Sequence, residues 1–485
     1  MIKLLDLIPD CPFQLPDMMV SGLKLDSRRV AAGDAFIAVP GYATDGRDYI
    51  DAAIAAGASA VLADMDEWTA GTMDAVPVIG VPNLKQQVSE VAGRFHGNPS
   101  HQLRVIGVTG TNGKTTVSNL IAQLWHHLEP AAAVLGTIGS GVMPQLLPEQ
   151  NTTPDAVTVQ QRLAGFYAEG ARSVAMEVSS HALVQHRVEA LRFATVIATN
   201  VSRDHLDYHG SMDAYIAAKK RLFTDFPSAI RIFNLDDSVV ASWGTAHDFW
   251  YSMEADAVGR DNTLVAIDID YTDDGTEFTL CWFAQRLRVR SPLLGDFNVA
   301  NVLAALLSPL VAGYELADVA ALVSHLKPVV GRMETFKKEG FPLVVVDYAH
   351  TPDALEHVLT AARRHCHGKL WCVFGCGGDR DRGKRPQMGQ VAARCADQIV
   401  VTDDNPRTED PQSIIDDIIS GMPANTAYIA SPGRSRTVLE TIRKAAAEDV
   451  VVLAGKGHET YQVIGTKSID YDERAVVASV LGGAA

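Results

Sequence analysis

A glycine-rich stretch at residues 107–116, GVTGTNGKTT, has the composition of a loop that holds phosphate groups. It follows the strand-like run 103–106 and precedes a segment with a helical pattern. Backbone N–H groups near a helix N-terminus can hold phosphate oxygens. The usual phosphate-loop spacing would place glycine at position 108, where this chain has Val108. We predict a nucleotide site with a shifted loop, in preference to the alternative of a glycine-rich turn with a solvated lysine.

This loop offers both a positive charge and an oxygen ligand. Lys114 would place its charge on the outer phosphates and take part in catalysis, and the Thr115 hydroxyl could bind Mg²⁺. The residues predicted to contact the nucleotide are Gly110, Thr111, Asn112, Gly113, Lys114, Thr115 and Thr116.

Two polar clusters follow later strand-like runs. Glu177, in MEVSSH, stands at a predicted strand end beside the phosphate loop, where a carboxylate could bind Mg²⁺. The alternative for Glu177 is a salt-bridged strand-end residue. Residues 203–209 contain five acidic, basic or histidine residues, and among them His205 is a candidate ligand for a second metal ion. The run AAKKR at 217–221 predicts, by itself, a solvated helix face.

The elements that must position these residues are apolar runs that alternate with helices. RVIGVTG, SVAMEVSS, ATVIATNVS and AIRIFNLDD form one series, and PLVVVDYAH, KLWCVFGCGG, QIVVTDDNP and VVVLAGKGHE form a second. Strands that are apolar on both faces favour a mainly parallel sheet covered on two sides, so the fold class is α/β. Each strand of the second series ends in a polar or glycine-rich turn. Because ligands gather at the carboxyl ends of such strands, we expect these turns to converge on one site.

A chain of 485 residues is long enough for about three domains. The first block contains an alanine-rich helix at 49–56 and the strand ASAVLAD, and it ends at the turn GNP. TLVAIDIDY and TEFTLCWF predict a β-hairpin insertion, and the uncharged run 297–314 predicts a buried helix that breaks at Pro309. The predicted domains are a smaller N-terminal α/β domain at 1–99, a central phosphate-loop domain at 100–330 and a C-terminal Rossmann-like α/β domain at 331–485.

Charge and cysteine usage exclude several classes of protein. The net charge of −16 disfavours general binding to nucleic acid or to an anionic membrane, because such a surface repels phosphates. Six scattered cysteines predict a reducing cytoplasm, and zinc at Cys372 and Cys376 is disfavoured because no second pair lies nearby. Asp6 interrupts the first apolar run and argues against a signal peptide. We therefore expect a cytoplasmic protein that acts on small molecules.

Together, the motifs resemble those of the Mur ligases. GTNGKTT, MEVSSHALVQHR, NVSRDHLDYHG, GDFNVANVLAA, GRME, DYAHTPDAL, GCGGDRDRGKR, DDNPRTE and AGKGHE stand in that family's order and approximate spacing. The motifs run from Leu25 to Glu459, and the shifted phosphate loop is the family's own form. The resemblance is strongest to the branch that adds meso-2,6-diaminopimelate to UDP-N-acetylmuramoyl-L-alanyl-D-glutamate in peptidoglycan precursor synthesis. It implies a monomeric ligase that uses ATP and Mg²⁺ to convert a carboxylate into an acyl phosphate, which an amine then attacks.

The family also implies roles for residues outside the phosphate loop. Thr115, Glu177 and His205 match metal ligands, and Lys219 matches a lysine that relatives carry as a carbamate. Adding CO₂ to that lysine converts an ammonium into an anion that can face a cation, and the resemblance therefore places Lys219 among the catalytic and metal-binding groups. The positions that match nucleotide contacts in relatives are Asn301, Arg332 and Asp347, which domain closure would bring onto the nucleotide.

Two groups of positions match the family's contacts to the nucleotide-sugar substrate. The first group lies in LDSRR and in GYATDG, where the chain departs from the family's loop pattern at positions 42 and 43. In the second group, Arg187 suits the D-glutamyl carboxylates because a guanidinium binds a carboxylate in bidentate fashion. The matched positions are Leu25, Ser27, Tyr42, Ala43, Thr44, Asn151, Thr152, Thr153, Ser179, Gln185 and Arg187.

The incoming amino acid is implied by the sequence DNPR at 404–407. Diaminopimelate differs from lysine by a carboxylate on the far carbon, so a site built for it needs a cation there, and Arg407 supplies one. Lysine-adding relatives lack this arginine. Arg380 matches a second contact to the amino acid, while Gly455 and Glu459 match groups that bind its amino and carboxyl ends. The implied amino-acid site comprises Arg380, Asp404, Asn405, Pro406, Arg407, Gly455 and Glu459.

Three alternatives remain. A lysine-adding Mur ligase differs at the residue equivalent to Arg407. A folylpolyglutamate synthase shares the central architecture and the ligation chemistry, but it would not carry DNPR or the first domain with LDSR. A phosphate-loop switch protein would bind nucleotide without synthesis, and it leaves the C-terminal turns unexplained.

Overall fold

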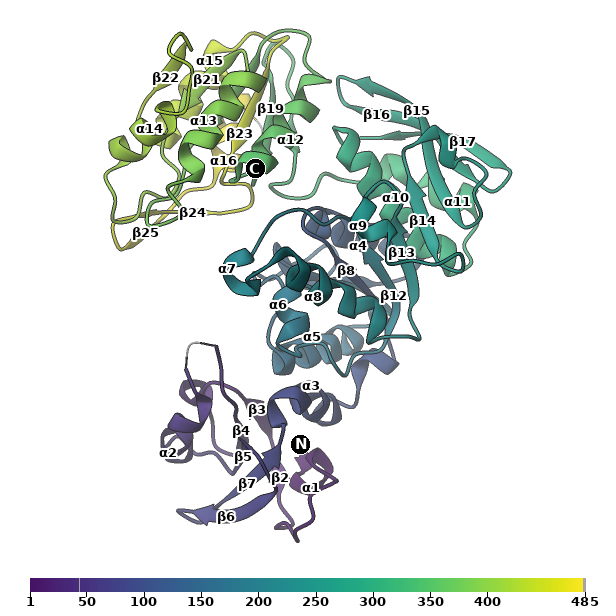
Figure 1. Ribbon diagram of the computed structural model, residues 1–485, viewed down its shortest axis with the longest axis vertical. Helices are drawn as coiled ribbons and strands as arrows, with labels where there is room; N and C mark the ends of the chain where they lie inside the picture. The colour runs from purple at the N-terminus through teal and green to yellow at the C-terminus, as the bar shows by residue number, and fades with distance from the viewer. Residues whose placement is uncertain (43, 483–485) are drawn as a thin grey trace. The chain divides into compact units, whose positions relative to one another are not determined.

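Two units make up the fold in the computed structural model, which describes residues 1–42 and 44–482. The first unit is Met1–Tyr251 with Ala304–Tyr314, and the second is Ser252–Leu303 with Glu315–Ala485. Figure 1 labels helices and strands of both units. Within the described residues, every helix is too short or too polar to cross a membrane.

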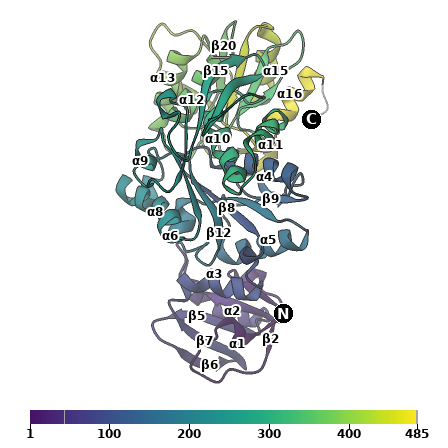
Figure 2. The ribbon, with the colours of Figure 1, turned by 90° about the vertical axis from the view of Figure 1, so that its right-hand side faces the viewer.

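The first unit begins with a five-stranded sheet in the order β3-β4-β5-β7-β6. β3, β4, β5 and β7 are parallel, and β6 is antiparallel to β7. Helix α3 covers one face and α2 packs on the other, as Figure 2 shows for α3. The predicted alanine-rich helix and the strand after it are confirmed as α2 and β5. The bounds are β1 Ile2–Lys3, α1 Leu4–Leu7, β2 Met19–Val20, β3 Gly22–Lys24, β4 Asp34–Ala38, α2 Ile50–Ala55, β5 Ala60–Met65, β6 Thr69–Met73, β7 Val76–Pro82 and α3 Leu84–Phe95.

The rest of the first unit is built on strands in the order β10-β9-β11-β8-β12-β13-β14. All are parallel except β10, which is antiparallel to β9. All four strands predicted from the first apolar series are confirmed, as β8, β11, β12 and β13. The bounds are β8 Arg104–Thr109, α4 Lys114–Leu128, β9 Ala132–Gly136, β10 Gly139–Val142, α5 Ala156–Ala168, β11 Ser173–Glu177, α6 Ser180–Val184, β12 Phe193–Ala198, α7 Leu206–His209, α8 Met212–Thr224, β13 Ile230–Asn234, α9 Ser238–Ala241 and β14 Phe249–Ser252.

The second unit opens with an antiparallel meander of β15, β16 and β17. The predicted hairpin is confirmed as β15 and β16, and β17 is a further strand in which arginines alternate with apolar residues. The predicted break of the next helix at Pro309 is wrong, because α10 continues past this residue to Val311. A proline near a helix end removes one backbone donor, and here the last turn tolerates the loss. The bounds are β15 Thr263–Thr272, β16 Gly275–Trp282, β17 Gln285–Ser291, α10 Asp296–Val311 and α11 Leu316–Ala321.

A six-stranded sheet in the order β18-β19-β23-β20-β21-β22 forms the C-terminal part of the second unit. It is parallel except for β18. Helices α12, α13 and α14 pack on one face, and α15 and α16 on the other, which confirms the predicted α/β class. The bounds are β18 Glu334–Phe336, β19 Leu343–Asp347, α12 Pro352–Arg363, β20 Leu370–Phe374, α13 Lys384–Cys395, β21 Gln398–Val401, α14 Pro411–Ile419, β22 Tyr428–Ala430, α15 Arg434–Lys444, β23 Val450–Ala454, β24 Tyr461–Ile464, β25 Lys467–Asp470 and α16 Glu473–Leu481.

Candidate functional site

The glycine-rich loop joins the end of β8 to the start of α4. Val108, which occupies the position of the usual first glycine, is buried within β8, so the strand extends into the region where an ordinary loop would begin. Gly110 has a φ of 151°, and a Cβ there would lie 1.9 Å from the Thr199 hydroxyl oxygen. Lys114 folds back over the loop and donates to the carbonyls of Gly110 and Thr111, both at 2.9 Å. The loop therefore has the backbone geometry and the positive charge that a phosphate chain needs.

Glu177 lies at the end of β11 and is fully buried. One carboxylate oxygen accepts hydrogen bonds from the Thr115 hydroxyl at 2.9 Å and the Thr137 hydroxyl at 3.1 Å, and the other accepts from the Thr137 backbone N–H at 2.6 Å. Within the described residues Glu177 forms no ion pair, so the alternative of a salt-bridged strand end is wrong. The fold brings Thr115 and Glu177, both predicted oxygen ligands, into direct contact.

A cavity of about 280 Å³ collects residues from loops far apart in the sequence. Eight of them were predicted to have a function, and they come from the phosphate loop, the segment after β10, and the segments that follow β11 and β12. Two lining residues were not predicted, namely Ser180 and His181. The cavity is lined by Lys114, Asn151, Thr152, Thr153, Ser179, Ser180, His181, Arg187, His205 and Lys219.

Lys219 shows that the charge run on α8 is not simply a solvated face. Its side chain is 1% exposed, and its Nζ donates to the Gly110 carbonyl at 2.6 Å and lies 4.5 Å from the centre of the Tyr215 ring. Burial, and next the charge of Lys114, lower the pKa of Lys219 well below its usual value. A neutral amine is the form that reacts with CO₂, so this environment suits a carbamate.

His181 and His205, which line the cavity, belong to a cluster of five aromatic and imidazole rings. The His181 ring lies 4.9 Å from that of His205 and 4.1 Å from that of Tyr208, and the His209 ring lies 5.2 Å from that of Tyr215. Burial, followed by the proximity of His205, lowers the pKa of His181 to about 4. The available signal for His181 was its place directly after Ser179 and Ser180, in the same motif as the predicted Glu177, Ser179, Gln185 and Arg187.

Gln185 and Arg187 act as a pair beside the cavity. Arg187 donates to the Gln185 side-chain oxygen at 2.7 Å and also contacts the Thr153 carbonyl at 2.5 Å, while Gln185 donates to the Tyr208 hydroxyl at 3.1 Å. Gln185 thus orients a guanidinium that is suited to carboxylates.

The N-terminal group of predicted substrate contacts lies partly at the surface. Ser27 is buried at the start of a short 3₁₀ turn, and Leu25 is half-buried. Tyr42 is 81% exposed, and its ring lies 5.3 Å from that of Tyr208. The Thr44 carbonyl accepts from the Gly41 N–H at 2.9 Å, whereas Ala43 lies outside the described residues.

In the second unit, the turns after β21 and β23 meet as the sequence predicts. Asn405 donates to the Glu459 carboxylate at 3.1 Å and accepts from Lys456 at 3.0 Å, and Lys456 donates to Glu459 at 2.6 Å. A Cβ on Gly455, whose φ is 113°, would lie 2.6 Å from a carboxylate oxygen of Asp404. Lys456 is fully buried and was missed, although it stands in the quoted AGKGHE motif.

Two guanidinium side chains flank Gly377. A Cβ placed on this glycine would lie 2.9 Å from an Arg407 nitrogen and 3.5 Å from the Cγ of Arg380. Arg407 follows the buried Pro406, is half-buried and donates to the Gly378 carbonyl at 2.8 Å. No carboxylate of the described residues forms an ion pair with Arg407 or Arg380. Their charges are therefore available to an anionic group.

The three predicted nucleotide contacts of the second unit have distinct surroundings. The Arg332 guanidinium stacks over the Tyr348 ring at 4.8 Å, and its Nε is buried without a hydrogen-bond partner among the described residues. Asp347 is buried at the end of β19 and accepts from the N–H groups of Met333 and Ala349, both at 2.7 Å. Burial raises the pKa of Asp347. Asn301 is buried in α10 and donates to the Asn298 side chain at 3.0 Å.

Glu409, in the DNPRTE loop, makes hydrogen bonds to the GGDRD loop, and its effect on the free energy of unfolding can be tested. Its carboxylate accepts from the buried Arg385 at 2.8 and 3.0 Å and from the Asp379 N–H at 2.6 Å. The hydrogen bonds from Arg385 are the main cause that lowers the pKa of Glu409 to about 2. Because the pKa of Glu409 is lower in the folded state, the ionised carboxylate stabilises the fold at pH values above 4.5, the pKa in the unfolded chain. This contribution is lost as the pH falls through the folded-state pKa of about 2.

Glu409→Gln is therefore expected to lower the free energy of unfolding at pH 7, with the deficit shrinking between about pH 4.5 and about pH 2. Urea denaturation at a series of pH values measures it. Glu440→Gln is the control, because Glu440 pairs with Arg436 on an exposed helix surface, and it should change little. A Glu409 deficit that stays constant down to pH 2 would contradict the assignment.

The comparisons with known proteins agree over almost the whole chain. Three family models match: Mur ligase family catalytic domain at residues 19–96, Mur ligase middle domain at 108–308, and Mur ligase glutamate ligase domain at 331–457. A solved structure of a UDP-N-acetylmuramoyl-L-alanyl-D-glutamate–2,6-diaminopimelate ligase is 37% identical, with 99% of each chain covered and a TM-score of 0.72.

Two more distant structures share the fold. One is the UDP-N-acetylmuramoylalanyl-D-glutamyl-2,6-diaminopimelate–D-alanyl-D-alanyl ligase from Acinetobacter baumannii, at 17% identity, 99% and 98% coverage and a TM-score of 0.66. The other is the Mycobacterium tuberculosis folylpolyglutamate synthase complexed with ADP and AMPPCP, at 15% identity, with 82% of this chain and 95% of that chain covered and a TM-score of 0.62.

Proposed function

The chain belongs to the Mur ligase family and is an ATP-dependent ligase, and from this premise we propose that it joins meso-2,6-diaminopimelate to UDP-N-acetylmuramoyl-L-alanyl-D-glutamate. The observation that carries the choice of amino acid is the pair of guanidinium side chains, Arg407 and Arg380, beside Gly377. Two cations suit the carboxylate on the far carbon of diaminopimelate, which lysine lacks.

ATP supplies the leaving group for amide formation. In the proposed reaction the γ-phosphoryl group moves to the glutamyl carboxylate and ADP leaves, and the amine then displaces phosphate from the acyl carbon and loses a proton. Phosphoryl transfer is catalysed mainly by positioning and charge neutralisation. The Lys114 charge and the loop N–H groups after β8 would hold the phosphates, and Asn301, Arg332 and Asp347 are assigned to the nucleotide as well.

The oxygen donors of Thr115 and Glu177, next in the chain to Lys114 and at the end of β11, fit Mg²⁺. The ion prefers oxygen ligands, and the Thr115 hydroxyl contacts the buried Glu177 carboxylate at 2.9 Å. Bound there, Mg²⁺ would neutralise phosphate charge. His205 and the carbamate of Lys219 would complete the metal-binding groups, because both side chains line the cavity of about 280 Å³ together with Lys114 of the phosphate loop. No three His, Cys, Asp or Glu side chains of the described residues lie together in a way that could hold a metal ion, so the proposed set draws on Thr115 and the carbamate of Lys219 as well.

The nucleotide-sugar substrate, the cellular compartment and the oligomeric state complete the proposed function. Arg187, held by Gln185 beside the cavity, would bind the D-glutamyl carboxylates. The segment 1–99 would bind the UDP moiety, 100–330 would bind ATP and 331–485 the amino acid. We place the reaction in the cytoplasm and assign it to a monomer. The net charge of −16 disfavours a nucleic-acid or membrane partner.

A substrate panel tests the proposal. The protein is incubated with ATP, Mg²⁺ and the UDP-dipeptide, and meso-diaminopimelate, lysine or glutamate is offered separately while product and released phosphate are measured. We expect incorporation of diaminopimelate, with phosphate release that requires both the UDP-dipeptide and the amino acid. Equal use of lysine would reject the substrate assignment. Phosphate release without an acceptor would favour a nucleotide switch.

A further inference from the structure

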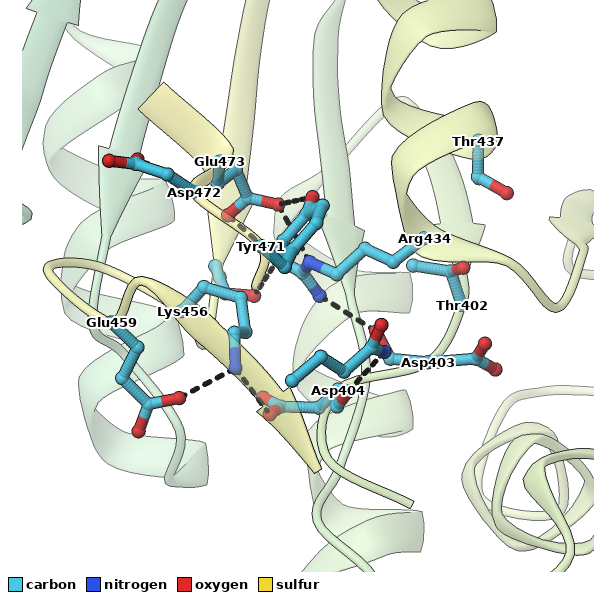
Figure 3. A network of polar contacts seen from close by, with 12 residues as sticks. Thr402, Asp403, Asp404, Arg434, Thr437, Lys456, Glu459, Tyr471, Asp472 and Glu473 are labelled. Atoms are coloured by element: carbon cyan, nitrogen blue, oxygen red, sulfur yellow. Dashed lines mark hydrogen bonds and ion pairs between the residues drawn. The ribbon is translucent and has the colours of Figure 1, made fainter. Parts of the chain in front are cut away.

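A fully buried ion pair lies beneath the predicted amino-acid site. Arg434, the first residue of α15, and Glu473, the first residue of α16, are both 0% exposed. The guanidinium makes a bidentate contact with the carboxylate, at 2.6 Å from Nε and 3.0 Å from Nη2, and the Tyr471 hydroxyl donates to the same carboxylate at 3.0 Å. Figure 3 shows the guanidinium between Glu473 and the segment of Asp403.

The remaining donors of Arg434 reach the backbone at two strand ends. Nη1 donates to the Asp403 carbonyl at 3.1 Å, and Nη2 donates to the Ala454 carbonyl at 2.8 Å. Asp403 directly precedes the DNPR loop at 404–407, and Ala454 ends β23 directly before the GKGHE loop at 455–459. β21 and β23 are not neighbours, because β20 lies between them in the sheet. One side chain therefore links two amino-acid-binding loops that the sheet itself does not join directly.

A second link joins the same loops farther along. Lys456 donates to the side chains of Asn405 and Glu459, and its Nζ lies 3.9 Å from an Asp404 carboxylate oxygen. Figure 3 shows Lys456 between Glu459 and Asp404. Lys456 lies within the predicted site, whereas Arg434 is covered and contacts only protein groups. The two links act at different points, because Arg434 contacts the residues directly before the two loops and Lys456 contacts residues within them.

The net stability that a buried ion pair provides does not explain why Arg434 and Glu473 occupy these buried positions. Desolvation offsets most of the attraction, and packed apolar residues often serve as well or better. Only a planar guanidinium, however, can hold one carboxylate and two separate carbonyl oxygens in a fixed geometry.

We propose that Arg434, held by Glu473, is a positioning residue that sets the spacing between the DNPR and GKGHE loops and so determines how tightly the diamino acid binds. This inference rests on the proposed function. It assigns Arg434 no contact with the substrate. It predicts that a substitution of Arg434 weakens binding of the amino acid and leaves binding of ATP and the UDP-dipeptide nearly unchanged.

The experiment compares wild type with Arg434→Lys and with the double variant Arg434→Met/Glu473→Gln, which removes both charges with little change of shape and leaves neither partner buried alone. We measure kcat and KM for the amino acid that the wild type incorporates, chosen from meso-diaminopimelate, lysine and glutamate, and KM for ATP and the UDP-dipeptide. The double variant should raise KM for the amino acid at least tenfold, with the other two KM values within twofold. The KM of Arg434→Lys for the amino acid should lie between those of the wild type and the double variant. A lysine ammonium cannot hold the Glu473 carboxylate and both backbone carbonyls at once.

Arg436→Met is the matched control, because Arg436 lies two residues along α15 and its side chain is 83% exposed. Hydrogen exchange gives a readout that needs no substrate: amides of 403–407 and 454–459 should lose protection in the double variant, while those of β19 and β20 keep it. Equal changes in all three KM values, unchanged KM for the amino acid, or unchanged loop protection would overturn the inference. If the wild type prefers lysine, the proposed function is contradicted but the inference on Arg434 is still tested. The Arg434 variants are then compared by their KM for lysine and by hydrogen exchange of the two loops.

Discussion

Arg407→Ala is expected to lower kcat/KM for meso-diaminopimelate by about 30- to 4,000-fold, converted from a loss of roughly 2–5 kcal/mol for a charge-assisted pair. The Arg407 side chain is half-buried beside Gly377 and forms no ion pair within the described residues. Its removal would leave the far carboxylate of the amino acid without its main cation. The weak use of lysine, which has no such carboxylate, should change far less.

Initial rates with each amino acid at saturating ATP and UDP-dipeptide measure this selectivity. Because Arg407 also donates to the Gly378 carbonyl, Arg407→Lys is a second variant that keeps the charge without the bidentate geometry, and it should give an intermediate loss. Arg394→Ala is the control, since Arg394 pairs with Glu356 at an exposed surface. If lysine and diaminopimelate lose the same factor, Arg407 supports the loop and does not select the amino acid.

The strands and the loops that follow them were largely readable from the sequence. Continuous apolar runs such as those of β8 and β23 can only be buried on both faces, and this fixes a parallel sheet with its ligands at one edge. The position of Lys219 in the cavity was implied only by the family resemblance, because the local pattern AAKKR indicates a solvated helix. The domain boundaries stay a prediction.

What the sequence did not provide comes from contacts between distant segments. Arg434 and Glu473 are 39 positions apart, and each taken alone resembles an ordinary surface residue at a helix start. Lys456 and His181 stood inside quoted motifs, but their roles depend on which loops the sheet order brings together. The strand β17 was not predicted separately, although its arginines alternate with apolar residues as in a strand with one exposed face.

Lys219→Ala is expected to reduce kcat by roughly a hundred- to a thousand-fold, the range seen when one preorganised charge-stabilising group is removed. The reason lies in the surroundings of the side chain. Its Nζ is buried 2.6 Å from the Gly110 carbonyl, and a plain ammonium there would repel a metal ion near Glu177. A carbamate reverses that sign, and the lowered pKa of Lys219 favours the neutral amine that reacts with CO₂.

Two measurements separate this role from a packing role. Short carboxylic acids added at rising concentration should restore part of the activity of Lys219→Ala, since they can replace the missing anion in the space left by the side chain. Wild type equilibrated with ¹³C-bicarbonate should give a carbamate signal in ¹³C NMR, and Lys219→Ala should lack it. Lys220→Ala, the next residue on α8, is the control and should keep both the signal and the activity. A wild type without the signal, or a variant that carboxylic acids do not rescue, would leave Lys219 as a structural lysine whose burial serves only the loop at Gly110.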